Sequence, residues 1–105
     1  MLTGCGVLRY TLHMIESFKH KGLKKLYEKG DRSGIRPDLI DKVERILSVL
    51  DAANYPQELD LPGYRLHKLK GDLKGFWAVT VHANWRIIYR MESGKAYDVE
   101  MIDYH

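Results

Sequence analysis

Positively charged side chains gather in one part of this chain, with aromatic residues between them. Residues 64–90 contain six Lys/Arg and one Asp, a net charge of +5, whereas the whole chain of 105 residues carries +3. Cations interleaved with aromatic rings on a strand-like pattern are typical of a surface that binds a phosphate backbone. A solvated strand face would show the same charge without any ligand, and charge alone favours neither interpretation.

Several polar residues in this stretch could line a phosphate site. Arg86 has a planar fork of donors that matches phosphate oxygens, and lysine is a common point charge for the same group. Arg86 could instead pair with Asp98 or Glu100 on a neighbouring strand, and a pair of lysines on an edge strand can simply prevent aggregation. The candidates are Lys68, Lys70, Asn84, Arg86 and Arg90.

Histidines in the basic half of the chain could transfer protons. His67 and His82 lie within the basic stretch, and His105 ends the chain directly after Asp103 and Tyr104. Imidazole gives and takes protons near neutral pH, although a surface histidine usually has no such role. By composition alone the last three residues are a tail, since chain ends are often frayed.

Two helices are predicted ahead of the basic stretch. Leu23, Leu26 and Tyr27 have the spacing of a short amphipathic helix, which Gly30 would end. Pro37 fits the first turn of a second helix. The apolar stripe of that helix covers three turns and consists of Leu39, Ile40, Val43, Ile46, Leu47 and Leu50.

Antiparallel strands are predicted after residue 63, where the hydrophobic period changes from 3.6 to 2. Apolar and polar residues alternate over 76–82, 84–91 and 97–102, and Ser93-Gly94 fits a hairpin turn. A further strand could lie at 14–18. This order of elements predicts an α+β fold, a twisted antiparallel sheet of three to five strands with two N-terminal helices packed on one face.

The alternation also predicts which side chains face the helices. That side should carry the apolar residues of 85–91, which are Trp85, Ile87, Tyr89 and Met91. Asn84, Arg86 and Arg90 would then project from the opposite face. Tyr64 and Phe76 are the better candidates for an exposed ring, because base stacking needs an accessible face.

Length and composition fit one soluble domain of ordinary hydrophobic and charged content. No apolar run approaches the roughly 20 residues of a membrane span, and residues 1–13 do not resemble a signal peptide. Cys5 is the single cysteine, which fits a reducing, cytoplasmic compartment, and no Cys/His spacing suggests a zinc site. We expect residues 1–13 to be an N-terminal extension of unclear role and residues 14–105 to form one domain.

The motifs of this chain resemble the HigB-type toxins of the RelE/ParE superfamily of bacterial toxin–antitoxin systems. The resemblance covers roughly residues 14–105. Its most specific part is Leu-Lys-Gly-Asp at 69–72 followed by Asn-Trp-Arg at 84–86. The run at 15–23, the Gly-Phe-Trp at 75–77 and the final Asp-Tyr-His at 103–105 also match.

This resemblance implies a RelE-like fold and a ribosome-dependent mRNA endonuclease that cuts the codon in the 30S A site. The 2′-hydroxyl of the RNA would attack the adjacent phosphate and the 5′-oxygen would leave, with no metal or other cofactor. Carried over by position, Lys70 and Arg86 would hold the phosphate and Asn84 would orient the site. The residues that would transfer protons are His67, Asp103, Tyr104 and His105, and which is base and which is acid stays open.

The resemblance also implies partners. These are a cognate HigA-type helix-turn-helix antitoxin, the ribosome and mRNA, with operator DNA contacted only through the antitoxin and no membrane involved. Two other functions remain open at this point: a ParE-like toxin without nuclease chemistry that acts on a protein such as DNA gyrase, and a non-catalytic RNA- or ribosome-binding module. Neither would need the combination of Lys70, Arg86 and His105.

Overall fold

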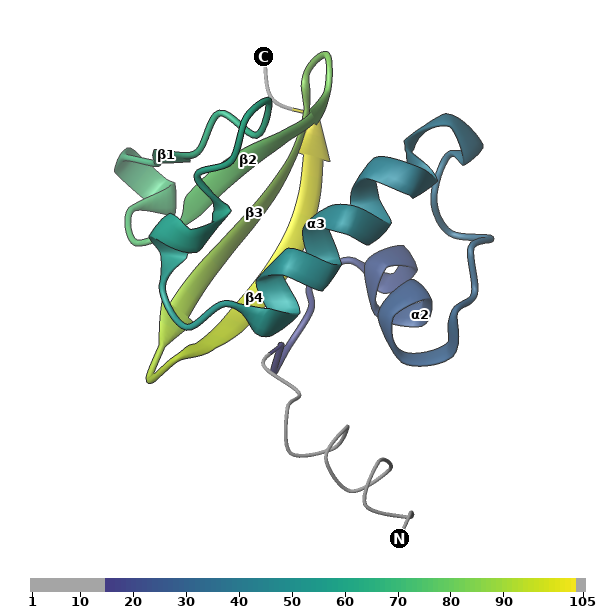
Figure 1. The fold of residues 1–105 in the computed structure, drawn as a ribbon, viewed down its shortest axis with the longest axis horizontal. Helices are drawn as coiled ribbons and strands as arrows, with labels where there is room; N and C mark the ends of the chain where they lie inside the picture. The colour runs from purple at the N-terminus through teal and green to yellow at the C-terminus, as the bar shows by residue number, and fades with distance from the viewer. Residues whose placement is uncertain (1–14, 104–105) are drawn as a thin grey trace, which may run out of the picture.

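Residues 15–103 are described by a computed structural model, and they form two helices and a four-stranded sheet. The helices are α2 (Lys21–Lys29) and α3 (Ile40–Ala52), and the strands are β1 (His67–Lys68), β2 (Trp77–His82), β3 (Trp85–Glu92) and β4 (Lys95–Asp103). Each strand is antiparallel to its neighbour, in the order β1-β2-β3-β4. Both helices contact β4 and lie on one side of the twisted sheet (Figure 1). The predicted α+β fold is confirmed.

The helix α2 begins at a side-chain cap and ends at a glycine. The Nδ1 atom of His20 accepts a hydrogen bond from the Leu23 amide at 3.1 Å. Gly30 follows the helix with a left-handed φ of 69°, and its amide donates to main-chain carbonyls of the last turn. Glycine adopts this conformation without a Cβ penalty, so the predicted stop at Gly30 is confirmed.

The apolar stripe of α3 forms the helical half of the main core. All six predicted stripe residues are buried, and Ile87 and Tyr89 of β3 belong to the same cluster, with Trp85 and Met91 packed against it. The predicted helix-facing side of β3 is therefore confirmed. Burial of each large apolar side chain stabilises the fold by about 1.5–3 kcal/mol. No helix among residues 15–103 is both long and apolar enough to span a membrane.

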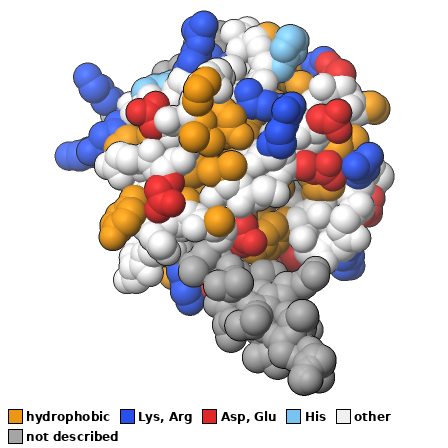
Figure 2. Space-filling view, viewed as in Figure 1, with side chains coloured by type: hydrophobic (Ala, Val, Ile, Leu, Met, Phe, Trp, Pro, Cys, Tyr) orange, Lys and Arg blue, Asp and Glu red, His pale blue; other side chains and the backbone are white. Residues whose placement is uncertain are grey.

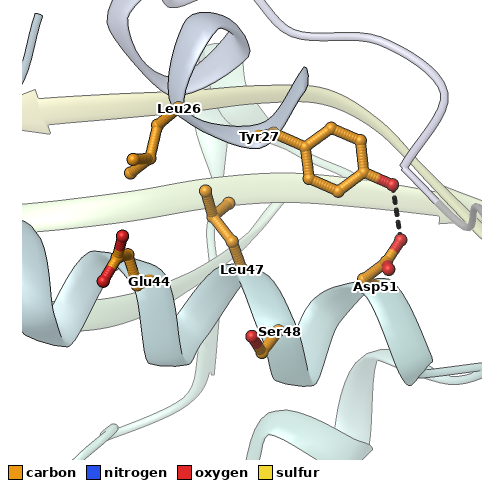
Figure 3. A pocket seen from close by; sticks show the side chains of 6 residues that line it. All are labelled: Leu26, Tyr27, Glu44, Leu47, Ser48 and Asp51. Carbon is orange, nitrogen blue, oxygen red and sulfur yellow. Dashed lines mark hydrogen bonds between the residues drawn. The ribbon is translucent and has the colours of Figure 1, made fainter. Parts of the chain in front are cut away.

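A polar contact joins the two helices at the edge of this core. The hydroxyl of Tyr27 on α2 donates to the Asp51 carboxylate on α3 at 2.5 Å, above a pocket also lined by Glu44 and Ser48 (Figure 3). Burial, followed by this hydrogen bond, raises the pKa of the Tyr27 hydroxyl above its usual range. The contact stabilises the helical layer, and the pocket has carboxylates where an RNA site would need cations.

The segment before α2 runs beside β4 without forming a regular strand. Ile15 and Phe18 make isolated parallel bridges to Ala96 and Val99. The strand predicted at 14–18 is thus reduced to two bridges, and residue 14 lies outside the described part of the chain.

The opposite face of the sheet carries a smaller cluster. Leu69, Ala78 and Ile88 are buried there, because the segment that follows β1 folds back with Leu73 and Phe76 over the strands. Tyr64 belongs to the main core and is only 9% exposed, so the prediction of an exposed ring at that position is wrong.

Candidate active site

His67 and Arg86 lie on the face of the sheet opposite the helices. His67 pairs with Ala78, and Arg86 pairs with Thr80 two residues further along β2. Residues that pair directly, or lie two apart on a strand, share one face. Ala78 lies in the smaller cluster on this side. The sheet therefore brings together two residues that are nineteen positions apart.

The ring of His67 is held by a main-chain carbonyl. Its Nδ1 atom lies 3.0 Å from the carbonyl oxygen of Arg65. Because a carbonyl oxygen can only accept a hydrogen bond, Nδ1 is the donor. In the neutral ring the lone pair is then on Nε2, which makes this nitrogen the proton acceptor.

The guanidinium of Arg86 is also held by the main chain. Its Nη1 atom donates to the carbonyl of Ala83 at 2.6 Å and to the carbonyl of Trp85 at 3.3 Å. These bonds orient the guanidinium before any ligand binds. An arginine fixed in this way can stabilise negative charge without reorganising during a reaction.

Arg90 lies on the same strand as Arg86 but has acidic neighbours. Its Nε donates to the Asp98 carboxylate at 2.8 Å, its Nη1 contacts Glu92, and its guanidinium stacks 4.9 Å from the centre of the Tyr97 ring. The hydrogen bond from Arg90 lowers the pKa of Asp98. Asp98, one of the alternative partners considered for Arg86, thus pairs with Arg90, whose role in RNA binding stays a prediction.

Lys68 and Lys70 lie at the β1 edge of the sheet. They share a hollow of about 400 Å³ with Lys74, and Lys68 Nζ lies 5.3 Å from the centre of the Trp77 ring. Figure 2 shows Lys and Arg side chains projecting at the left, over β1 and the segment that follows it. Lys74 was not among the predicted residues, although its place in the basic stretch was a signal for it.

Asn84 and Asp103 come together at one end of the sheet. Asn84 is in the turn between β2 and β3, and Asp103 pairs with Trp85 at the end of β4. Arg86 is the next residue on β3. Tyr104 and His105 follow Asp103 directly and lie outside the described residues, so their predicted roles stay predictions.

A pocket of about 360 Å³ opens at this end of the sheet. It is lined by Arg65, Thr80, Val81, His82, Ala83 and Arg86. Arg65 and Thr80 were not among the predicted site residues. Arg65 had a signal in the charge of its stretch, whereas Thr80 had none.

Solved structures with this architecture identify the general class of fold. YafQ from Escherichia coli strain BL21(DE3) superposes with a TM-score of 0.55 at 19% identity, covering 84% of this chain and 88% of YafQ. The YoeB dimer from Staphylococcus aureus gives 0.53 at 15% identity, covering 88% of this chain and 98% of the other. The described residues therefore have the fold shared by YafQ and YoeB.

Sequence similarity narrows the class to one family. The model of the HigB-like toxin family, described as the RelE-like toxin of the type II toxin–antitoxin system HigB, matches residues 16–105. "Endoribonuclease HigB" of Proteus vulgaris is 48% identical over 92 residues, 88% of this chain and 100% of that protein. "Toxin HigB-1" of Vibrio cholerae serotype O1 is 35% identical over 85 residues, 79% of this chain and 90% of the other. The chain belongs to the HigB-like toxin family, which confirms the resemblance seen in the sequence.

Proposed function

We propose that this chain is the toxin of a type II toxin–antitoxin system and an endoribonuclease that cuts mRNA in the ribosomal A site. The family supports the toxin role, and the endoribonuclease named among its relatives supports the activity. The observation that carries the proposal is the placement of His67 and Arg86 on one face of the sheet, with Asn84 and Asp103 at the adjoining end.

The chemistry requires a base for the attacking 2′-hydroxyl. His67 is suited to this step because its Nδ1–H is held by the Arg65 carbonyl, which leaves Nε2 as the proton acceptor. As the 2′-oxygen attacks the adjacent phosphorus, the proton passes to Nε2. The carbonyl of Arg65 then supports the cationic ring that results.

Negative charge grows on the phosphate oxygens as the attack proceeds, and cations must offset it. Arg86 is already oriented by two carbonyl groups, and Lys70 adds a second charge from the β1 edge. The 5′-oxygen must gain a proton as it leaves. We assign this step to the Asp103-Tyr104-His105 group, which continues from the end of β4.

The partners follow from the same proposal. A type II toxin is inhibited by a protein antitoxin. We propose that the antitoxin here is a helix-turn-helix protein of the HigA type, and that only the antitoxin binds operator DNA. The substrate complex is a cytoplasmic ribosome with mRNA in its 30S A site. Growth arrest on expression, relieved by the neighbouring antitoxin gene, would support this arrangement.

Cleavage of defined mRNA on programmed ribosomes tests the activity. We expect the purified protein to produce new 5′ ends within the A-site codon. Arg86→Ala should reduce the single-turnover rate by about 100-fold or more, because one preorganised donor to the developing charge is lost. Arg32→Ala is the matched control, since Arg32 is an exposed arginine that pairs with Glu44 on the helical layer.

Three outcomes would count against the proposal. Absence of cleavage by the folded, growth-arresting protein would favour a toxin that acts on a protein target. Unchanged cleavage in Arg86→Ala would remove this arginine from the mechanism. Ribosome binding without cleavage would leave an RNA- or ribosome-binding module.

A further inference from the structure

Two residues that line the pocket at the end of the sheet near Arg86 have an unusual backbone. Arg65 and Ala83 have φ values of 51° and 52°, a left-handed conformation that costs a residue with a side chain about 1–2 kcal/mol. Each presents its carbonyl to a candidate catalytic side chain, Arg65 to His67 at 3.0 Å and Ala83 to Arg86 at 2.6 Å. Strain of this kind is retained where it serves a site.

The side chain of Arg65 adds positive charge to this pocket. Arg65 is exposed, and among residues 15–103 the pocket is lined by two arginines and His82 but by no carboxylate. The pocket volume of about 360 Å³ falls within the range of small-molecule sites. Its charge suits the phosphodiester groups of a nucleic-acid backbone.

The register of the sheet sets the spacing of the two arginines. The amide of Thr80 donates to the carbonyl of Tyr64 at 2.7 Å, and Thr80 pairs with Arg86 on its other side. Arg65 and Arg86 therefore lie on opposite sides of β2, with backbones separated by about two strand spacings, roughly 10 Å. At this separation, the two guanidinium groups can bind different phosphates.

We propose that Arg65 binds the mRNA phosphodiester next to the one that is cleaved, while its carbonyl positions His67. This inference rests on the proposed function, because it assigns Arg86 to the cleaved phosphate. The guanidinium of Arg65 makes a charge-assisted contact with the neighbouring phosphate and fixes the register of the RNA. Arg65 thus acts through its side chain on binding and through its main chain on catalysis.

The substitution Arg65→Gly separates these two roles. Glycine adopts a positive φ readily, so the turn and its carbonyl should be kept while the guanidinium is lost. On programmed ribosomes we expect the toxin concentration at half-maximal rate to rise about tenfold, which corresponds to one charged hydrogen bond. The affinity should fall more than the single-turnover rate at saturation, and the pH profile should keep its shape, because the carbonyl that holds His67 is retained.

Salt dependence gives an independent measure of the phosphate contact. Binding is measured with ribosomes whose A-site codon carries 2′-O-methyl groups, which block the attacking oxygen. Loss of one contact to single-stranded RNA should lower the slope of log K against log salt by about 0.7. Arg65→Lys, which keeps the charge, should restore most of the slope, and Arg32→Ala should leave it unchanged.

The outcomes separate this inference from the proposed function. If the parent protein fails to cleave, the proposed function falls and Arg65 has no substrate to bind. If the parent cleaves and Arg65→Gly has the same affinity and slope, the phosphate contact is refuted. A changed pH profile with unchanged affinity would leave only the positioning role. Ribosomes whose mRNA ends before the A site test the identity of the RNA. If Arg65→Gly loses as much affinity for these ribosomes as for programmed ones, the contact is with ribosomal RNA and the proposal is overturned.

Discussion

Main-chain carbonyl groups hold the two side chains on which the proposed chemistry depends. His67 donates to Arg65, and Arg86 donates to Ala83 and Trp85. Each of these acceptors is a neutral main-chain group. The backbone therefore preorganises the candidate proton acceptor and the candidate phosphate-binding cation.

Thr80 lies on β2, between the strands that carry these two side chains. Its buried hydroxyl should reduce the stability of the fold. Its hydroxyl is buried and has no hydrogen-bond partner among residues 15–103. Burial of an unsatisfied hydroxyl is unfavourable, so we expect Thr80→Val to keep or raise stability by about 1 kcal/mol. Chemical denaturation checks this, with Ser48→Ala on α3 as a control. A clear loss of stability would show that the hydroxyl has a partner after all.

Close approach of two backbones fixes how α2 meets the rest of the helical layer. Gly22 on α2 faces Gly34 in the loop before α3, and a Cβ built on Gly22 would lie 2.4 Å from the Gly34 carbonyl oxygen. That distance is shorter than any real Cβ contact, and both partners are main chain. The helix therefore depends on glycine at this position despite the low helix propensity of glycine.

Gly22→Ala should thus destabilise the protein although alanine favours helices. We expect the free energy of unfolding to fall by about 1–3 kcal/mol, because the clash can be relieved only by moving backbone. Thermal unfolding followed by circular dichroism measures the change. Lys24→Ala, on an exposed position of the same helix, should be neutral or slightly stabilising. A stabilised Gly22→Ala would show that α2 can shift freely.

The two faces of the sheet have different roles in the molecule. The helices cover one face of the sheet with the main core, and the other face carries the candidate site beside a smaller cluster. His20 stands where the layers meet, since it caps α2 and lies within electrostatic reach of Glu100 on β4. Protonation of His20 should therefore affect the stability of the entire domain.

Burial lowers the pKa of His20 below 6.5, and the Glu100 charge only partly opposes this effect. The unfolded chain then binds the proton more readily, so stability is complete above about pH 6.5 and falls as the pH drops below it. We expect the unfolding midpoint in denaturant to be lower at about pH 5.5 than at about pH 7.5. His20→Asn keeps an N-cap acceptor and should remove this difference. An unchanged pH dependence in the variant would assign the effect to another group.

Local patterns in the sequence determined most of the architecture. The stripe on α3, the glycine that ends α2, the alternation along β3 and the Ser93-Gly94 turn are all confirmed. Each depends on the period or conformation of neighbouring residues, which a single sequence displays. The family was also evident, because the matching motifs are short and contiguous.

The prediction of an exposed ring at Tyr64 was wrong because it depended on which distant residues pack against that ring. Tyr64 is buried because Leu39, Val43 and their neighbours supply a core that the sequence around Tyr64 does not reveal. Pro37 does begin the predicted helix, whose first turn is a short 3-10 turn that leads directly into α3. At Tyr64, contacts with distant residues outweighed the local context.

The sequence by itself supplied the candidates for the chemistry: His67, Lys70, Arg86 and the final Asp103-Tyr104-His105. Only the tertiary structure decided that Arg65 and Thr80 belong beside Arg86, and that the carbonyls of Arg65 and Ala83 orient the candidate catalytic side chains. The reason is physical. Strand register and left-handed turns fix which side chains meet across a sheet, and neither follows from the spacing of residues along the chain.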